Sequence, residues 1–208
     1  MTQFPPRADR SSRSPLGAAL LAFLGAVAPV TAGSALDDGF GVTSPADGYR
    51  MENYRAPTPE SVPGATRLDT SGVRNLLSRE GGAVLLDVMA AEIARQPAPV
   101  WLVPEPRLHL PGSIWLPNVG YGELAAETEA YFRNHLDRLT GGDRTKALVF
   151  YCIVDCWMGW NAAKRAAEWG YGRVFWYPGG TDDWRAAGLP LVPACPEPLQ
   201  PGAGPACP

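Results

Sequence analysis

Two cysteines separated by three residues are the side chains of this sequence that are best placed to do chemistry. Cys152 follows the apolar run 147–151, and Cys156 is followed at once by Trp157. The helix-like segment 158–169 comes next, so the pair stands where a buried strand changes into the N-terminus of a helix. Backbone N–H groups and the helix dipole stabilise a thiolate at such a point. The pair therefore predicts thiol chemistry.

The second cysteine leaves several uses of the pair open. Cys156 could resolve a persulfide or a sulfenate on Cys152 and so form a reversible disulfide. Two thiolates could instead bind a soft metal such as Cu(I), although neither His109 nor His135 has metal-ligand spacing to the pair. A static disulfide is the third use, but a bond between near neighbours gives little entropic stabilisation. With two further cysteines in the tail, three disulfide pairings are possible, and the sequence does not choose among them.

Other residues are candidates for a site around the pair. Asp155 adds a negative charge beside the thiolate and should oppose its formation. Trp157, Trp160 and Trp101 are expected to wall a mouth that suits a neutral or aromatic ligand. Asp87, at the end of an apolar run, either orients the site or accepts hydrogen bonds from loop N–H groups. The candidate residues are Cys152, Asp155 and Cys156 for catalysis and Asp87, Trp101, Trp157 and Trp160 for binding.

The elements that must position these residues alternate along the chain. Short apolar runs typical of buried strands lie between amphipathic segments typical of helices. The strands are expected at 83–88, 113–116, 147–151 and 173–177, and the helices from 69–71 to Gly81, at 123–139, at 158–169 and at 182–187. This order predicts an α/β sandwich with a central, mostly parallel sheet. The segment 96–111, which contains five prolines, is expected to be a long, ligand-covering loop.

The N-terminal region predicts export. Three arginines precede the apolar stretch 16–30, and Val30-Thr-Ala32 fits a cleavage site, as in a secretory signal peptide. The stretch is too short and too rich in Gly and Ala to favour a spanning helix, so an uncleaved anchor is the minor alternative and the mature chain is expected to contain no span. The expected organisation is a signal peptide at 1–32, an extended arm at 33–64, a domain at 65–192 and a Pro-rich tail at 193–208.

Charge and motifs exclude several classes of function. Loss of residues 1–32 removes Arg7, Arg10, Arg13 and Asp9, which changes the formal charge from -3 to -5. The acidic mature chain has no Lys/Arg cluster on one predicted face, which argues against nucleic acid or an anionic membrane as a partner. It also has no phosphate-binding or dinucleotide fingerprint and no Ser-His-Asp or zinc-type arrangement. We therefore expect no cofactor, no resident metal and no hydrolase activity.

The order of the elements resembles a rhodanese-like (sulfurtransferase) domain over residues 68–192. The resemblance is carried by the segments 84–88, 110–118, 149–152 and 174–180, with Trp184 behind the last. It implies a three-layer sandwich with helices on both faces of the sheet and a persulfide on Cys152, held by N–H groups of a six-residue loop. In active members an arginine at the last loop position helps to hold thiosulfate, whereas Trp157 stands there in this chain. Met89 stands where many relatives carry a basic residue. Transfer of sulfur from thiosulfate to cyanide is therefore disfavoured.

A narrower resemblance is to an exported family named for a cysteine pair followed by Trp (Cys-x-x-x-Cys-Trp here) and associated with catabolism by pyrroloquinoline-quinone (PQQ) enzymes. The matches are the segments 48–57, 152–157 and 160–165. This resemblance implies a periplasmic protein that supports PQQ-dependent alcohol oxidation, with a PQQ-dependent dehydrogenase or a cytochrome c as partner. The leading hypothesis is thiol–disulfide or sulfur-transfer chemistry by Cys152 and Cys156. The alternatives are a non-catalytic module that presents a Trp-rich pocket to such a protein or a small ligand, and a copper carrier.

Overall fold

The computed structural model describes residues 48–79, 81–95, 98–200 and 207. The expected signal peptide at 1–32 and the first part of the expected arm, 33–47, lie outside these residues. In the described part of the chain, no helix combines the length and the apolar character that a membrane crossing requires.

A five-stranded sheet forms the centre of the domain, with the strand order β1-β8-β7-β2-β6 and every neighbouring pair parallel. The strands are β1 (Thr66–Arg67), β2 (Val84–Asp87), β6 (Ile114–Trp115), β7 (Leu148–Tyr151) and β8 (Val174–Tyr177). Asp87 of β2 pairs in register with Tyr151 of β7 and with Trp115 of β6. The carboxyl ends of β2 and β7 therefore lie side by side, and the residues that follow them start from one edge of the sheet.

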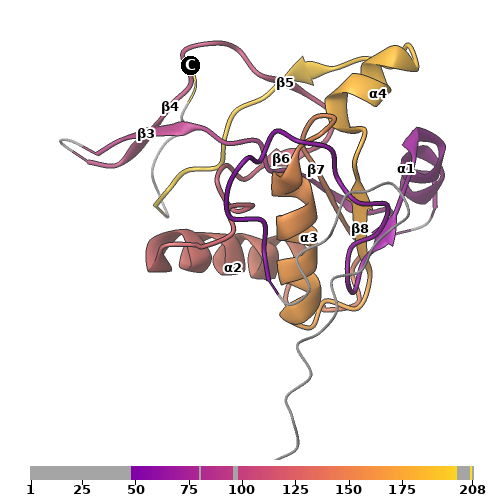
Figure 1. Ribbon diagram of the computed structural model, residues 1–208, viewed down its shortest axis with the longest axis horizontal. Coiled ribbons are helices and arrows are strands. Elements are labelled where there is room, and N and C mark those ends of the chain that lie inside the picture. The colour runs from indigo at the N-terminus through magenta and orange to yellow at the C-terminus, as the bar shows by residue number, and fades with distance from the viewer. Residues whose placement is uncertain (1–47, 80, 96–97, 201–206, 208) are drawn as a thin grey trace, which may run out of the picture. The chain divides into compact units, whose positions relative to one another are not determined.

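Helices cover both faces of this sheet (Figure 1). The helices α2 (Ala126–Thr140) and α3 (Trp157–Glu168) pack on one face, and α1 (Thr70–Leu77) and α4 (Gly180–Ala186) on the other. Side chains alternate along β7 accordingly, because Phe150 joins the cluster under α2 and α3 whereas Tyr151 joins the cluster with α1 and α4. The predicted α/β fold with a central parallel sheet is confirmed.

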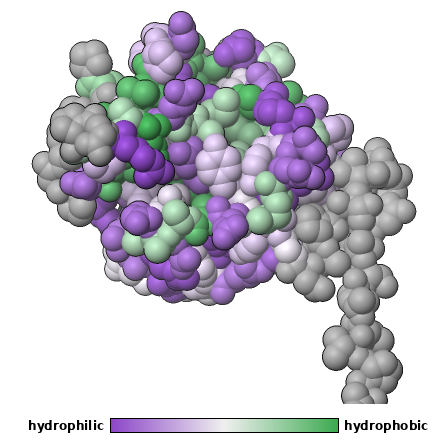
Figure 2. All heavy atoms as spheres, turned by 60° about the vertical axis from the view of Figure 1, so that its left-hand side comes forward, coloured by the Kyte–Doolittle hydropathy of each residue, from purple (hydrophilic) through white to green (hydrophobic). Residues whose placement is uncertain are grey.

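The segment 96–111 differs from the expected loop. It contains β4 (Val100–Leu102), which pairs with β3 (Glu92–Ala94) as an antiparallel ribbon, and β5 (Leu108–His109), which pairs with β9 (Val192–Pro193) of the tail. Strands of two or three residues between prolines are too short to show a periodic pattern, so they could not be recognised from the sequence. On this side of the domain hydrophobic side chains are interspersed with hydrophilic ones (Figure 2), and Val100 and Leu102 are among the exposed apolar residues.

Candidate functional site

The cysteine loop joins β7 to α3, and a disulfide connects its two cysteines. Cys152 directly follows β7, and Cys156 is the N-cap residue of α3. Their Cα atoms are 6.2 Å apart, and both residues are buried, with 2% and 4% of their surface exposed. A second disulfide joins Cys195 to Cys207 in the tail. The helix expected at 158–169 begins at Trp157, so Cys156, and not Cys152, directly precedes its N-terminus. The end of the α3 dipole therefore acts on Cys156.

The N-terminal arm pairs with the Cys156 end of the loop. Arg55 and Cys156 form an antiparallel β-bridge, and the Trp157 N–H donates to the Tyr54 carbonyl at 2.9 Å. The Asp155 carbonyl accepts a hydrogen bond from the Ala56 N–H at 3.1 Å. Asp155 has a left-handed backbone (φ 54°), a conformation that Asp tolerates better than most residues. Its side chain is exposed, so the structure ties Asp155 to this site through its backbone.

The start of α4 holds the Cys152 end of the loop. Ile153 bridges to Gly180, and the Thr181 N–H donates to the Cys152 carbonyl at 3.2 Å. A Cβ atom at residue 180 would collide with that carbonyl, so this approach requires glycine. The Asp182 carboxylate accepts a hydrogen bond from the Val154 N–H at 2.9 Å. The Val154 N–H, which could otherwise bind an anionic ligand, is thus already bonded to a carboxylate of the protein.

Met89 brings a third sulfur to the pair. Its Sδ atom lies 3.4 Å from the Sγ atom of Cys152. Its backbone N–H donates to the Asp87 carboxylate at 3.0 Å, which confirms the hydrogen bond to a loop N–H that the sequence predicted for Asp87. Asp87 has no exposed surface, and Arg107 binds its two oxygens at 2.5 and 2.7 Å. Arg107, in the segment 96–111, was missed. A carboxylate at the end of a buried strand needs a cationic partner, and this need could have pointed to an arginine in the neighbouring loop.

A pocket of about 520 Å³ opens at the cysteine loop, although neither cysteine lines it. Met89 and Ile153 line it next to Cys152, and residues 102–108 form the facing wall. The lining carries both signs of charge, with Arg107 and Arg185 on one hand and Glu92, Glu105 and Asp182 on the other. The segment 96–111 therefore supplies much of the wall of a pocket that reaches the cysteine loop, and this pocket is the natural place for a ligand of the pair.

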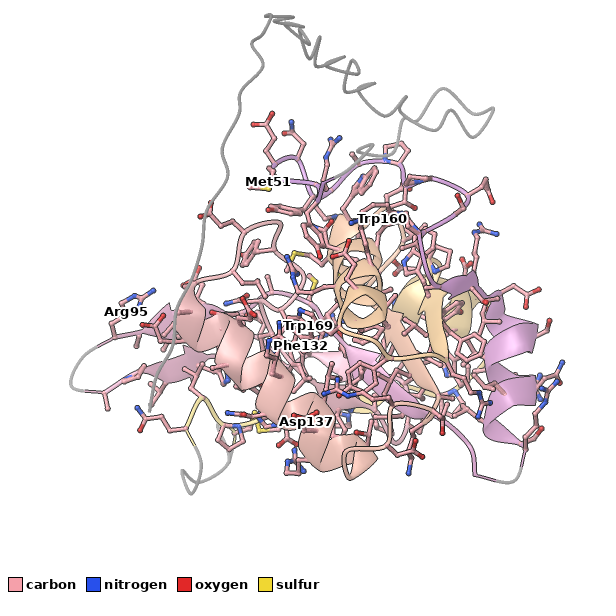
Figure 3. All side chains as sticks on the ribbon, turned by 90° about the horizontal axis from the view of Figure 1, so that it is seen from below. Met51, Arg95, Phe132, Asp137, Trp160 and Trp169 are labelled. Atoms are coloured by element: carbon pink, nitrogen blue, oxygen red, sulfur yellow. A yellow bond between two sulfur atoms is a disulfide. The ribbon has the colours of Figure 1, made fainter. Side chains whose placement is uncertain are left out.

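The three candidate tryptophans do not wall this pocket. Trp157 and Trp160 are fully buried, and their indole N–H groups donate to the carbonyls of Pro57 at 3.0 Å and Ser61 at 2.8 Å in the arm. The Trp160 side chain extends from α3 to the arm (Figure 3). Trp101 is 5% exposed and donates to the Glu197 carbonyl in the tail at 2.8 Å. The expectation of a tryptophan-walled mouth is wrong here, because each indole anchors an extended segment with both its apolar area and its N–H group.

Further bonds fix the arm over the start of α3. The fully buried Asn161 accepts from the Arg50 N–H at 3.0 Å and donates to the carbonyls of Arg50 at 2.9 Å and Gly120 at 2.8 Å. The Arg50 guanidinium lies 5.0 Å from the centre of the Trp157 ring. The arm is thus bonded both to the cysteine loop and to the helix that follows it.

Burial governs the titration of the nearby polar groups. Burial raises the pKa of Tyr151 well above 10, and the Tyr151 hydroxyl donates to Ser113 Oγ at 2.6 Å. Burial also lowers the pKa of His109 below its ordinary 6.5, although the Asp87 carboxylate opposes this shift. Both side chains therefore remain neutral at neutral pH. Among the residues that the structure describes, no group of three His, Cys, Asp or Glu side chains is placed to hold a metal ion.

A solved structure and a family model are similar to this chain. A similar solved structure is the 30 kDa polysulfide-sulfur transferase homodimer of Wolinella succinogenes, which is 18% identical over 62% of this chain and 79% of that chain, with a TM-score of 0.40. A search of the curated proteins gave no match. The family model described as "Rhodanese-like domain" matches residues 71–187, which is more than half of the chain. The chain therefore belongs to the rhodanese-like domain family.

Proposed function

We propose that the protein performs thiol–disulfide or sulfur-transfer chemistry with a Cys152–Cys156 pair that opens and closes. The observation that carries the proposal is the position of the disulfide. It joins the residue after β7, the nucleophile position in the resemblance, to the N-cap residue of α3. Membership of the rhodanese-like family supports sulfur as the transferred group.

In the proposed reaction Cys152 carries the sulfur and Cys156 releases it. The Cys152 thiolate attacks the outer sulfur of a small organic persulfide. The S–S bond of the donor breaks, the outer sulfur forms a persulfide on Cys152, and the organic thiolate leaves. The Cys156 thiol then loses its proton, and its thiolate attacks the Cys152 Sγ atom. The S–S bond of the persulfide breaks, hydrosulfide leaves, and the disulfide forms. A dithiol reductant restores both thiols with two electrons and two protons. The α3 N-terminus favours the Cys156 thiolate that the second step requires.

The loop does not suit thiosulfate as the donor. Asp182 already accepts the Val154 N–H, and its carboxylate repels an incoming dianion. Trp157, which stands at the last loop position, is buried beneath the arm. The mixed charges of the pocket fit a donor of low net charge such as an organic persulfide.

The proposed setting is the periplasm, beside a PQQ-dependent dehydrogenase or a cytochrome c. The signal-like segment 1–32 and the resemblance at 48–57 and 152–157 support it. Cell fractionation tests the location. Recovery of the protein in the cytoplasm, with residues 1–32 still attached, contradicts it.

Mass spectrometry of the reduced protein tests the reaction. The protein is treated with an organic persulfide, its thiols are blocked, and the intact mass is measured. Because Cys156→Ser lacks the resolving thiol, this variant should accumulate one extra sulfur on Cys152, whereas the unchanged protein should return to the disulfide and release hydrosulfide. A Cys207→Ser variant, altered only in the tail, should behave as the unchanged protein does. Absence of the extra sulfur in Cys156→Ser contradicts the proposal.

The burial of both sulfurs favours one alternative, a non-catalytic binding module in which the disulfide is static. The pocket walled by residues 102–108 would then carry the function. Growth on an alcohol that requires PQQ enzymes separates the two. Loss of growth in Cys152→Ser with normal growth in Arg185→Ala, which alters the pocket rim, supports the thiol reaction. The reverse pattern supports the module.

A further inference from the structure

Three sulfur atoms meet at the edge of the sheet in this protein. Cys152 Sγ is bonded to Cys156 Sγ and lies 3.4 Å from Met89 Sδ. The contact arises because β2 and β7 are neighbours in the sheet with Asp87 opposite Tyr151, so the residues after the two strands leave it together. We propose that the protein with this disulfide reduced binds one Cu(I) ion through Cys152, Cys156 and Met89.

The types of ligand select the metal. Two thiolates and a thioether are soft ligands, which favour Cu(I) over the hard and borderline cations of proteins. Zinc in a structural site takes four ligands, mostly from Cys, His, Asp and Glu. Over the described ranges no group of three such side chains could hold a metal. Since Met89 completes the set only as a thioether, the site is suited to Cu(I) rather than to zinc.

The distances agree with a shared ion. Two sulfurs bound to one metal at about 2.3 Å each lie roughly 4 Å apart, as in zinc–thiolate sites. Met89 Sδ is already at a similar distance from Cys152 Sγ, 3.4 Å. The Cα atoms of Cys152 and Cys156 are 6.2 Å apart, so the two thiolates can separate to this spacing through side-chain rotation once their bond opens.

The surroundings of Met89 fix its backbone and leave a route for the ion. The Met89 N–H is bonded to Asp87, which in turn is held by Arg107. Such outer partners orient a metal ligand. Met89 also lines the pocket of about 520 Å³ together with Ile153. An ion delivered by a small carrier therefore reaches the sulfurs through this pocket.

The steps that form the site balance in electrons and protons. A dithiol reductant supplies two electrons and two protons that convert the disulfide into two thiols. Cu(I) then displaces the two thiol protons, and the three-sulfur site carries one net negative charge. The affinity must therefore decrease as the pH falls. The proposal shares one premise with the proposed function, which is that the pair opens, and it does not require sulfur transfer.

The test is a Cu(I) titration of the full chain, reduced without oxygen, against a coloured Cu(I) chelator. Peptide mapping of alkylated protein first establishes that Cys152 and Cys156 are free. We expect one ion per chain with three sulfur neighbours by X-ray absorption. Met89→Leu should weaken binding by about ten-fold or more and leave two sulfur neighbours. Met51→Leu, a control on the exposed part of the arm, should bind as the unchanged protein does.

The outcomes separate the two proposals. If both thiols are free but no ion binds, or if Met89→Leu binds as tightly as Met51→Leu, the copper site is refuted and the sulfur-transfer proposal stands. Preference for zinc over Cu(I) also refutes the site. If Cys152 and Cys156 never become free under reductant, both proposals fail, because each needs an open pair.

Discussion

Replacing Arg107 with alanine leaves the Asp87 carboxylate without its charged partner. The carboxylate has no exposed surface, and only 12% of the Arg107 side chain is exposed, so little water reaches the pair. Both carboxylate oxygens accept from the guanidinium, at 2.5 and 2.7 Å. Removal of one partner of a buried ion pair destabilises a protein by about 3–5 kcal/mol, because the other charge is left uncompensated. We expect a decrease of this size in the free energy of unfolding of Arg107→Ala.

Urea unfolding of the oxidised protein, followed by tryptophan fluorescence, measures this change by linear extrapolation. The matched control is Arg67→Ala. Arg67 pairs with Glu60 at 3.3 Å, and their side chains are 43% and 45% exposed. An exposed pair contributes about 1 kcal/mol or less, so the control should change little. The double variant Asp87→Asn/Arg107→Leu, without the buried charge, should recover part of the loss. Equal effects of Arg107→Ala and Arg67→Ala would refute the reasoning.

Three further predictions concern the arm, the histidines and the tail. Asn161→Ala leaves the backbone groups of Arg50 and Gly120 without their hydrogen-bond partner, which costs about 1–3 kcal/mol for each buried group. Limited proteolysis should therefore cut residues 48–64 faster in this variant. An unchanged rate of cleavage contradicts the role of these contacts in holding the arm. Burial lowers the pKa of His109 and His135 below the ordinary 6.5. As the pH falls below about 6.5, these histidines therefore take up protons in the unfolded chain before they do so in the folded one, and the free energy of unfolding decreases. His109→Gln should flatten that decrease in urea titrations, and an identical slope argues against it. Cys207→Ser opens the tail disulfide and should cost about 2–4 kcal/mol on thermal unfolding, whereas an unchanged Tm contradicts it.

The order of strands and helices could be predicted because its signals are local. The apolar run at 147–151 and the helix-like segment after it became β7 and α3 within a few residues. The first helix, expected to start at 69–71, begins at Thr70, and the side chain of its N-cap residue Asp69 accepts the Gly72 N–H at 2.7 Å. Such features depend on neighbours in the sequence, so one sequence suffices to find them.

The contacts of the site could not be predicted because they depend on long-range pairing. Met89 and Cys152 meet only because β2 lies beside β7 in a particular register, and the apolar runs did not specify the strand order. Arg107 stands among prolines, where a charged residue is ordinarily solvated. Trp157 and Trp160 had the composition of a ligand wall, but the carbonyls of the arm use their N–H groups.

The state of Cys152 in cells tests the central claim most directly. Protein isolated under thiol-blocking conditions is digested, and the peptides that contain Cys152 and Cys156 are identified by mass. We predict a mixture of disulfide and free thiols that shifts with mild reductant, and an extra sulfur on Cys152 that accumulates in Cys156→Ser. A pair that is permanently bridged, resists mild reductant and never carries an extra sulfur would contradict the account.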